Sequence, residues 1–181
     1  MDPKIFLDGL EHHRVSAQKA LDKQRQSELG QFLTPPSIAN MMVGMFGDLP
    51  EYINLIDPGS GVGTLTAAFV SYALQVTHKP RMIKATAYEL EPSFINGLNI
   101  TLSACENLCK RNKVKFEYNI VQEDFIASSV EIIKSRNSFF SVEQPDYNVA
   151  ILNPPYKKIQ NKSYIKGLLK SVDIDTTNLY T

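Results

Sequence analysis

A glycine-rich turn between an apolar segment and an amphipathic one constrains the fold of this chain most strongly. Residues 53–57 have the apolar character of a strand, and residues 58–63, Pro-Gly-Ser-Gly-Val-Gly, form the turn. Apolar side chains then recur at helical spacing at Leu65, Phe69, Tyr72 and Val76. Glycine lets the backbone pass close to a ligand, and the start of a helix offers unpaired N–H groups. The segment predicts a nucleotide site, although a tight turn without a ligand has the same pattern.

The residues around the turn select among nucleotides. No Gly-Lys-Ser/Thr follows, as a phosphate-binding P-loop requires, and Thr64-Leu65 breaks the glycine spacing of a dinucleotide fingerprint. Asp57 ends the strand, where a carboxylate would repel a pyrophosphate but could accept hydrogen bonds from an ammonium group. We therefore expect an amino-acid-bearing nucleoside such as S-adenosylmethionine.

A second strand and helix follow the first pair. Ile83, Ala85 and Ala87 alternate with Lys84, Thr86 and Tyr88, and the helix that starts at Pro92 has an apolar face at Phe94, Leu98, Leu102 and Cys105. Glu89 comes directly after the strand, where a nucleotide-binding sheet commonly places the carboxylate that accepts the ribose hydroxyls. The alternative for Glu89 is a solvated carboxylate near the start of a helix.

A third strand alternates apolar and polar residues from Val114 to Ile120, which predicts one buried face and a place near the edge of the sheet. Asp124 and Phe125 follow it and could accept a hydrogen bond from an adenine amino group and stack on its ring. Alternatively, Asp124 caps a helix and Phe125 belongs to the core.

A fourth apolar segment, residues 147–152, leads into Asn153-Pro154-Pro155-Tyr156. Open α/β sheets bind ligands at the carboxyl ends of their strands. Asparagine offers a carbonyl acceptor, the prolines fix the backbone, and tyrosine supplies a face for stacking. The tetrapeptide predicts a site for a planar amino group, although such a string also occurs in simple turns.

The N-terminal part predicts helices. Residues 6–29 mix apolar and charged side chains, as one or two amphipathic helices do, and a further helix is expected over residues 37–46. We expect the apolar face of that helix to pack in the core, with Ile38, Met41, Met42 and Met45. With its length of 181 residues and 43% hydrophobic content, the chain suits one compact α/β unit.

Taken in order, these motifs resemble the gamma class of DNA adenine-N6 methyltransferases from restriction-modification systems. Residues 30–35, which include Phe32 and Thr34, resemble the N-terminal cofactor motif of that class, and residues 57–63 resemble its main cofactor motif. The resemblance implies a Rossmann-like fold with a mostly parallel sheet and S-adenosylmethionine as cofactor. It implies cofactor binding by Phe32, Thr34, Asp57, Gly59, Gly61, Gly63, Glu89, Asp124 and Phe125, and catalysis by Asn153, Pro154, Pro155 and Tyr156.

The resemblance also implies a mechanism. The target adenine is swung out of the duplex, Tyr156 stacks on it, and the Asn153 side-chain oxygen and the Pro154 carbonyl accept its amino protons. Members of this class continue after the catalytic motif with further strands and a DNA-reading domain, whereas this chain ends at Thr181. We therefore expect a single truncated domain over residues 1–181, with N-terminal helices and cofactor motif in 1–50 and the sheet core in 51–181. We expect four of the usual seven strands, weak cofactor binding and poor methylation by these residues alone.

Double-stranded DNA is the expected partner, together with a possible restriction endonuclease or specificity domain of the same system. Residues 147–172 contain five lysines and no Asp or Glu. Of these, Lys157 and Lys158 are expected to contact phosphates, unless the run is an ordinary solvated loop. The net charge is zero, with 19 basic and 19 acidic residues, which is unusual for a protein whose whole surface binds DNA.

Other features narrow the class of protein. No apolar run approaches a membrane span and no secretory signal starts the chain, so the cytoplasm is the expected location. Cys105 and Cys109 are four residues apart on a predicted helix, and we expect them to be reduced and to hold no metal. Two alternative functions stay open: methylation of an RNA adenine or a protein glutamine, and an inactive cofactor-binding fragment.

Overall fold

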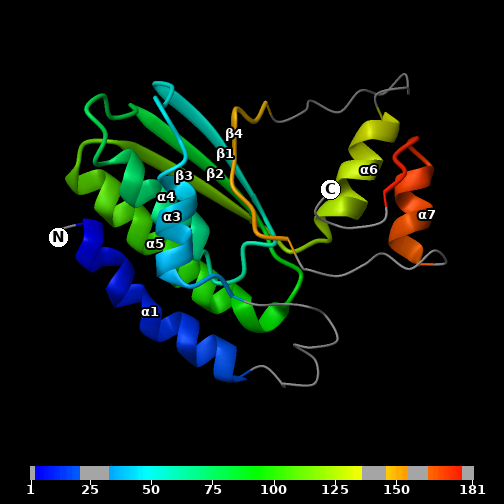
Figure 1. Cartoon of the computed structure of the whole chain (residues 1–181), viewed down its shortest axis with the longest axis horizontal. Helices are drawn as coiled ribbons and strands as arrows, with labels where there is room; N and C mark the ends of the chain where they lie inside the picture. Colours follow the sequence, from blue (N-terminus) through cyan, green and yellow to red (C-terminus); the bar gives the residue numbers. More distant parts are fainter. Residues whose placement is uncertain (1–2, 21–32, 136–145, 155–162, 177–181) are drawn as a thin grey trace.

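The computed structural model describes residues 3–20, 33–135, 146–154 and 163–176 (Figure 1). Helices and strands alternate along most of this part of the chain. In order, the elements are α1 (Pro3–Ala20), α3 (Pro36–Val43), β1 (Tyr52–Pro58), α4 (Thr64–Ala73), β2 (Met82–Tyr88), α5 (Pro92–Arg111), β3 (Lys115–Val121), α6 (Phe125–Ser135), β4 (Val149–Ala150) and α7 (Tyr164–Lys170).

The four strands form one parallel sheet in the order β3-β2-β1-β4. Ile53 of β1 pairs with Ile83 of β2, which pairs with Phe116 of β3, so apolar residues of neighbouring strands share a row. As the alternating pattern predicted, β3 lies at one edge of the sheet. The chain adds β2 and β3 on one side of β1 and then returns to place β4 on the other side.

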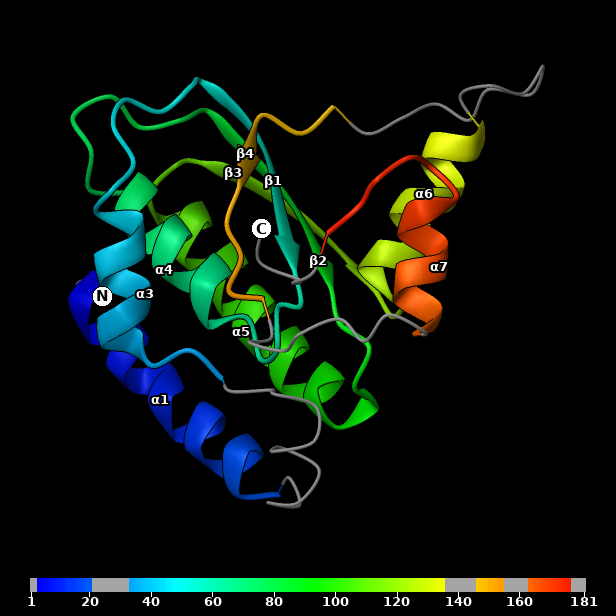
Figure 2. The same cartoon turned by 45° about the vertical axis from the view of Figure 1, so that its right-hand side comes forward.

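The helices cover the two faces of the sheet as this connectivity requires. Parallel strands are joined by right-handed crossovers, so a reversal in strand order moves the connecting helix to the opposite face. Figures 1 and 2 show α1, α3, α4 and α5 on one side of the sheet and α6 with α7 on the other. The α/β prediction is confirmed, with a sheet that is entirely parallel over the described residues.

Helix α4 lies at the centre of the core. Eight of its ten residues are buried, because the sheet covers one side and α1, α3 and α5 cover the others. Its alanines, Ala67, Ala68 and Ala73, are fully covered and let neighbouring elements approach closely. Phe6 and Leu7 of α1 belong to the same buried cluster, so the N-terminal helix is part of the core and packs against α4 and α5.

Two expectations about the N-terminal helices need correction. Helix α3 ends at Val43, earlier than residue 46, and its buried side chains are Ala39 and Val43. Met42 is partly buried and packs against the core, as predicted, but Ile38, Met41 and Met45 are 42%, 61% and 82% exposed, so the prediction that these three pack in the core is wrong. Ala39 and Val43 are the buried residues of α3, Ile38 and Met41 lie on its exposed side, and Met45 lies beyond its end. Residues 21–32, the second half of the expected N-terminal helices, lie outside the described part.

Strand β4, Val149–Ala150, is shorter than the apolar segment 147–152 predicted, and side-chain bonds supplement its backbone bonds to β1. The backbone N–H of Asn54 donates to the side-chain oxygen of Asn148 at 2.8 Å, and the Asn148 amide donates to the Tyr52 carbonyl at 2.8 Å. The backbone N–H of Asn148 also donates to the Asn54 carbonyl at 3.1 Å, so side-chain and backbone bonds together hold the start of the strand against β1. The backbone N–H of Ile151 still donates to the Ile56 carbonyl at 3.0 Å.

Two further findings concern the described residues. No helix among them is both long and apolar enough to cross a membrane. Cys105 and Cys109 are free thiols buried in the core, and burial raises the pKa of Cys109 to about 12.

Candidate functional site

The structure brings the glycine turn and Asn153 to the same edge of the sheet. Ile56 of β1 is paired with Ala150 of β4, so Gly59 and Asn153 each lie three residues beyond a paired position on neighbouring parallel strands. Strand order reverses between β1 and β4, and α/β sheets bind ligands at the carboxyl ends of strands at such a reversal. The two motifs therefore follow neighbouring strands at the same end of the sheet.

The turn after β1 is held in place by the end of β2. The backbone N–H groups of Gly59 and Ser60 both donate to the Tyr88 carbonyl at 2.9 Å. Gly59 and Gly61 have φ angles of +72° and +58°, which other residues rarely adopt. A Cβ at Gly59 would meet open space, whereas a Cβ at Gly61 would lie 2.5 Å from Leu33 Cδ2. Gly59 therefore presents bare backbone outward, and Gly61 accommodates the segment before α3.

The side-chain carboxylate of Asp57 is buried, and only one of its two oxygens accepts a hydrogen bond from the described residues. Its exposed fraction is 1%, and Oδ2 accepts a hydrogen bond from Thr66 Oγ1 at 2.6 Å. Oδ1 is buried and has no hydrogen-bond partner among the described residues. Burial raises the pKa of Asp57 to about 7, against the lowering effect of the Thr66 hydrogen bond. An acceptor in this position suits a ligand that brings an N–H donor or a positive charge.

Glu89 is buried and bonded to the turn. Its Oε2 accepts from the Gly61 N–H and its Oε1 from the Glu91 N–H, both at 2.7 Å. The interpretation as a solvated carboxylate is therefore wrong. Burial raises the pKa of Glu89, and the backbone hydrogen bonds oppose that rise. A carboxylate has about four lone-pair sites, so Glu89 retains capacity to accept hydroxyl groups as well.

Asp124 caps a helix, which was the alternative interpretation of this residue. Its Oδ1 accepts from the N–H groups of Ile126 and Ala127 at 2.8 and 3.0 Å, at the start of α6. Phe125 is half-buried and meets Tyr88 edge to face, with ring centroids 5.2 Å apart. The cap uses one carboxylate oxygen and fixes the pair at the end of β3, beside the end of β2.

Asn153 is joined to Thr34, a residue of the motif that precedes the turn. The Asn153 side-chain amide donates to Thr34 Oγ1 at 3.0 Å across 119 residues of chain. Thr34 is buried, and Asn153 and Pro154 are half-buried. Phe32, Pro155, Tyr156, Lys157 and Lys158 lie outside the described residues.

The lysine run is smaller than the sequence indicated. Lys166 is buried, with Nζ 3.3 Å from Asp175 Oδ1 and 3.3 Å from the Thr176 carbonyl, so it is part of a local structure around α7. Lys170 is exposed. Asp175 lies just beyond the segment without acidic residues, which explains why the charge pattern overstated the run.

Sequence reasoning missed residues that support the site. Thr66 carries a hydroxyl in an otherwise apolar stretch of α4, and this contrast with Leu65 and Ala67 was a usable signal. Arg14 and Gln18 contact the backbone of Leu33 from α1. No sequence pattern marks those contacts, because they depend on how α1 packs.

Comparison with known proteins finds two bacterial relatives. No family model matches the chain. M.PstI from Providencia stuartii, a Type II methyltransferase, is 35% identical over 177 residues that cover 98% of this chain. M.BsuBI from Bacillus subtilis, a second Type II methyltransferase, is 30% identical over 177 residues, or 97% of this chain. The chain is thus similar over nearly its whole length to part of two Type II methyltransferases, and it spans about a third of each relative, 33% and 34%.

A solved structure resembles this chain in fold. A Listeria monocytogenes protein described as a class I S-adenosylmethionine-dependent methyltransferase superposes with a TM-score of 0.59 at 12% identity. The alignment covers 98% of this chain and 46% of that protein. The chain thus has the class I methyltransferase fold, which confirms the Rossmann-like prediction.

Proposed function

We propose that this chain carries the S-adenosylmethionine site and the catalytic amide of a site-specific DNA adenine-N6 methyltransferase from a restriction-modification system. The observation that carries the proposal is the Asn153–Thr34 hydrogen bond beside the glycine turn, which joins the amide to the motif before α3 at the reversal of strand order. The Type II methyltransferase relatives and the class I fold support the same function.

The described residues fit S-adenosylmethionine. The buried Oδ1 of Asp57, which has no hydrogen-bond partner in the described part of the chain, suits the ammonium group of its methionine part, and Glu89 suits the ribose hydroxyls. Asp124 and Phe125 are assigned to the adenine ring. The bare backbone at Gly59 gives the nucleoside room to approach. The same cofactor is assigned to the remaining motif residues Phe32, Thr34, Gly61 and Gly63.

The catalytic roles follow from the orientation of the Asn153 amide. Its amino group faces Thr34, so its oxygen faces away from Thr34 and is the end that can accept a hydrogen bond from a substrate N–H. Together with the Pro154 carbonyl, it would accept hydrogen bonds from both N–H groups of the target amine and localise the nitrogen lone pair. Bound S-adenosylmethionine supplies a methyl group on a positively charged sulfur. The amine sheds its proton after transfer, so the residues act by positioning and hydrogen bonding.

The substrate in this proposal is an adenine in double-stranded DNA. Its amino group is not accessible within the base stack, so the base must be flipped out, and we assign its reception to Tyr156 and its neighbours Pro154 and Pro155. Lys157 and Lys158 would hold the flanking phosphates. Reading of a specific DNA site and partnership with a restriction endonuclease are proposed for the whole protein, since the relatives are about three times as long as this chain.

A labelled-methyl assay tests the function. The chain, and the complete gene product that contains it, are incubated with S-adenosylmethionine carrying a labelled methyl group and with duplex DNA, RNA or protein extract. Label in DNA recovered as N6-methyladenine supports the proposal. Label in RNA or in glutamine would move the enzyme to another substrate class, and cofactor binding without any transfer would indicate an inactive cofactor-binding protein.

A further inference from the structure

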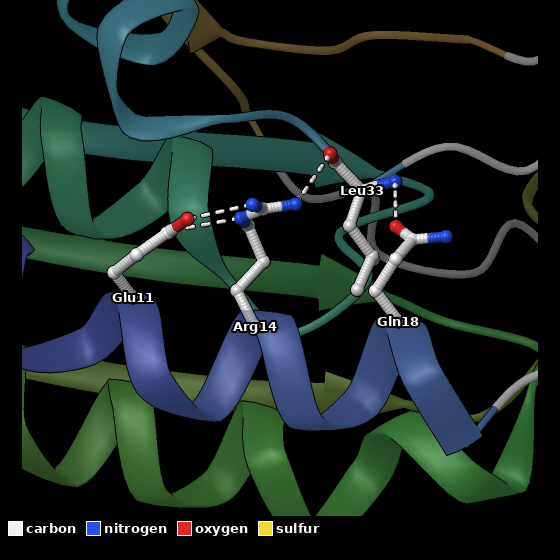
Figure 3. Close-up of polar contacts among 4 residues, drawn as sticks. All are labelled: Glu11, Arg14, Gln18 and Leu33. Atoms are coloured by element: carbon white, nitrogen blue, oxygen red, sulfur yellow. Dashed lines mark hydrogen bonds and ion pairs between the residues drawn. The ribbon is translucent and has the colours of Figure 1, made fainter.

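Two side chains of α1 hold the backbone of Leu33 from below, as Figure 3 shows. The Leu33 N–H donates to Gln18 Oε1 at 3.1 Å, and Arg14 Nη1 donates to the Leu33 carbonyl at 3.4 Å. Arg14 is itself fixed by Glu11, to which its Nε and Nη2 donate at 2.8 and 2.6 Å. Both polar backbone groups of Leu33 are therefore bonded to one helix.

Leu33 also touches the turn and precedes the residue that holds the catalytic amide. Its Cδ2 fills the space that a side chain at Gly61 would need. Thr34 follows directly and accepts the hydrogen bond from Asn153. A continuous set of contacts thus runs from α1 through Leu33 to both halves of the proposed site.

Residues 33–35 belong to neither a helix nor a strand, so no regular ladder fixes their position relative to the sheet. Backbone groups in such a segment depend on side-chain partners. Gln18 and Arg14 provide these partners on one face of α1, four residues apart. The bond from Gln18 is the shorter of the two and carries most of the restraint.

We propose that Gln18, assisted by Arg14, is a positioning residue that sets the orientation of the Asn153 amide through Leu33 and Thr34. The catalytic meaning of this inference rests on the proposed function. The physical coupling between Gln18 and Asn153 does not, because it is a property of the protein without ligand.

The coupling is tested by nuclear magnetic resonance on the ligand-free chain labelled with ¹⁵N. The side-chain amide signals of Asn153 are identified by their disappearance in Asn153→Asp. Gln18→Met removes the acceptor at nearly constant volume, Gln18→Glu keeps an acceptor, and Lys19→Met places the same new side chain at the next position of α1. Affinity for S-adenosylmethionine is then measured for each variant by calorimetry.

We expect Gln18→Met to move the Asn153 amide signals by several line widths and to weaken cofactor binding about three- to tenfold, as removal of one hydrogen bond would. Gln18→Glu should restore both values, and Lys19→Met should change neither. If Gln18→Met does not fold, Gln18→Asn, whose shorter amide cannot reach Leu33, replaces it. Unmoved Asn153 signals in the folded variant, or equal movement in Lys19→Met, would overturn the inference.

The two proposals fail in different ways. If the wild-type chain and the complete gene product bind no S-adenosylmethionine, the proposed function falls, while the Asn153 signals still decide the coupling. If the wild type binds the cofactor and the Asn153 signals ignore Gln18, only the coupling falls.

Discussion

Thr66, in the first turn of α4, donates a 2.6 Å hydrogen bond to Asp57 at the end of β1. The bond joins the helix after the glycine turn to the strand before it and so closes the turn from inside. It also fixes the Asp57 carboxylate with its second oxygen buried and without a partner among the described residues. The titration of this carboxyl group should therefore change the stability of the folded chain with pH.

Stability should fall as pH rises from about 4 to about 7. Asp57 has a pKa raised to about 7 in the folded chain, against 3.8 ordinarily, so in this window the folded state holds a proton that the unfolded state has released. One such proton changes the free energy of unfolding by up to about 1.4 kcal/mol per pH unit. Urea denaturation at pH 5, 6, 7 and 8 measures the slope.

Asp57→Asn is the matched control, because asparagine resembles the protonated side chain. The variant should show a shallower slope, and Glu89, whose pKa burial also raises, should supply what remains. A slope that is the same in both proteins would remove Asp57 as its source.

Gly61→Ala should destabilise the chain more than Gly59→Ala. Both positions have positive φ, which costs an L-residue about 1–2 kcal/mol, but only the Cβ at position 61 meets another atom, Leu33 Cδ2. The clash should add about 1–3 kcal/mol, and combining the change with Leu33→Ala should recover that part. Denaturant titration of the single and double variants gives the coupling energy; strictly additive effects would contradict the contact.

Asn153→Ala in the complete gene product should lower methyl transfer at least about a hundredfold and leave cofactor affinity nearly intact, since the missing acceptor acts on the substrate amine. Single-turnover rates and calorimetry separate the two effects. Thr34→Val removes the hydroxyl that orients the amide and should also slow transfer, whereas Thr34→Ser keeps it. Equal reduction of transfer and cofactor affinity in Asn153→Ala would refute its assignment.

Changing Lys157 and Lys158 to Ala together should weaken DNA binding at low salt without altering sequence preference. Removing a lysine that neutralises one phosphate should reduce the slope of log K against log salt by about 0.9. Binding measured from about 50 to 200 mM salt tests this, with the exposed Lys170→Ala as the control. An unchanged slope would show that neither lysine contacts a DNA phosphate.

The sequence predicted the sheet well because its signals are local. Alternation in β3 and the apolar run in β1 follow from burial of one or both strand faces, and the turn follows from glycines that adopt positive φ. Pro92 also marked the start of α5 correctly. These features depend on residues within a few positions of one another.

The misses share a different cause, which is dependence on distant parts of the chain. Ile38 and Met41 have the spacing of core residues, but α3 buries Ala39 and Val43 instead, so tertiary packing overrides the pattern. The Asn148 side chain bonds to β1, 94 residues away, at the start of β4. The contact of Asn153 with Thr34 likewise exists only after the sheet has formed.

The burial of α4 on nearly every side links the glycine-rich bend to the packing of the N-terminal helices. A helix without a water-facing stripe gains little from forming before its neighbours cover it. The bend at residues 58–63 leads directly into that helix, so we expect it to keep its shape only while α1 and α3 pack against α4. Removal of α1 should therefore destabilise the bend and the core together.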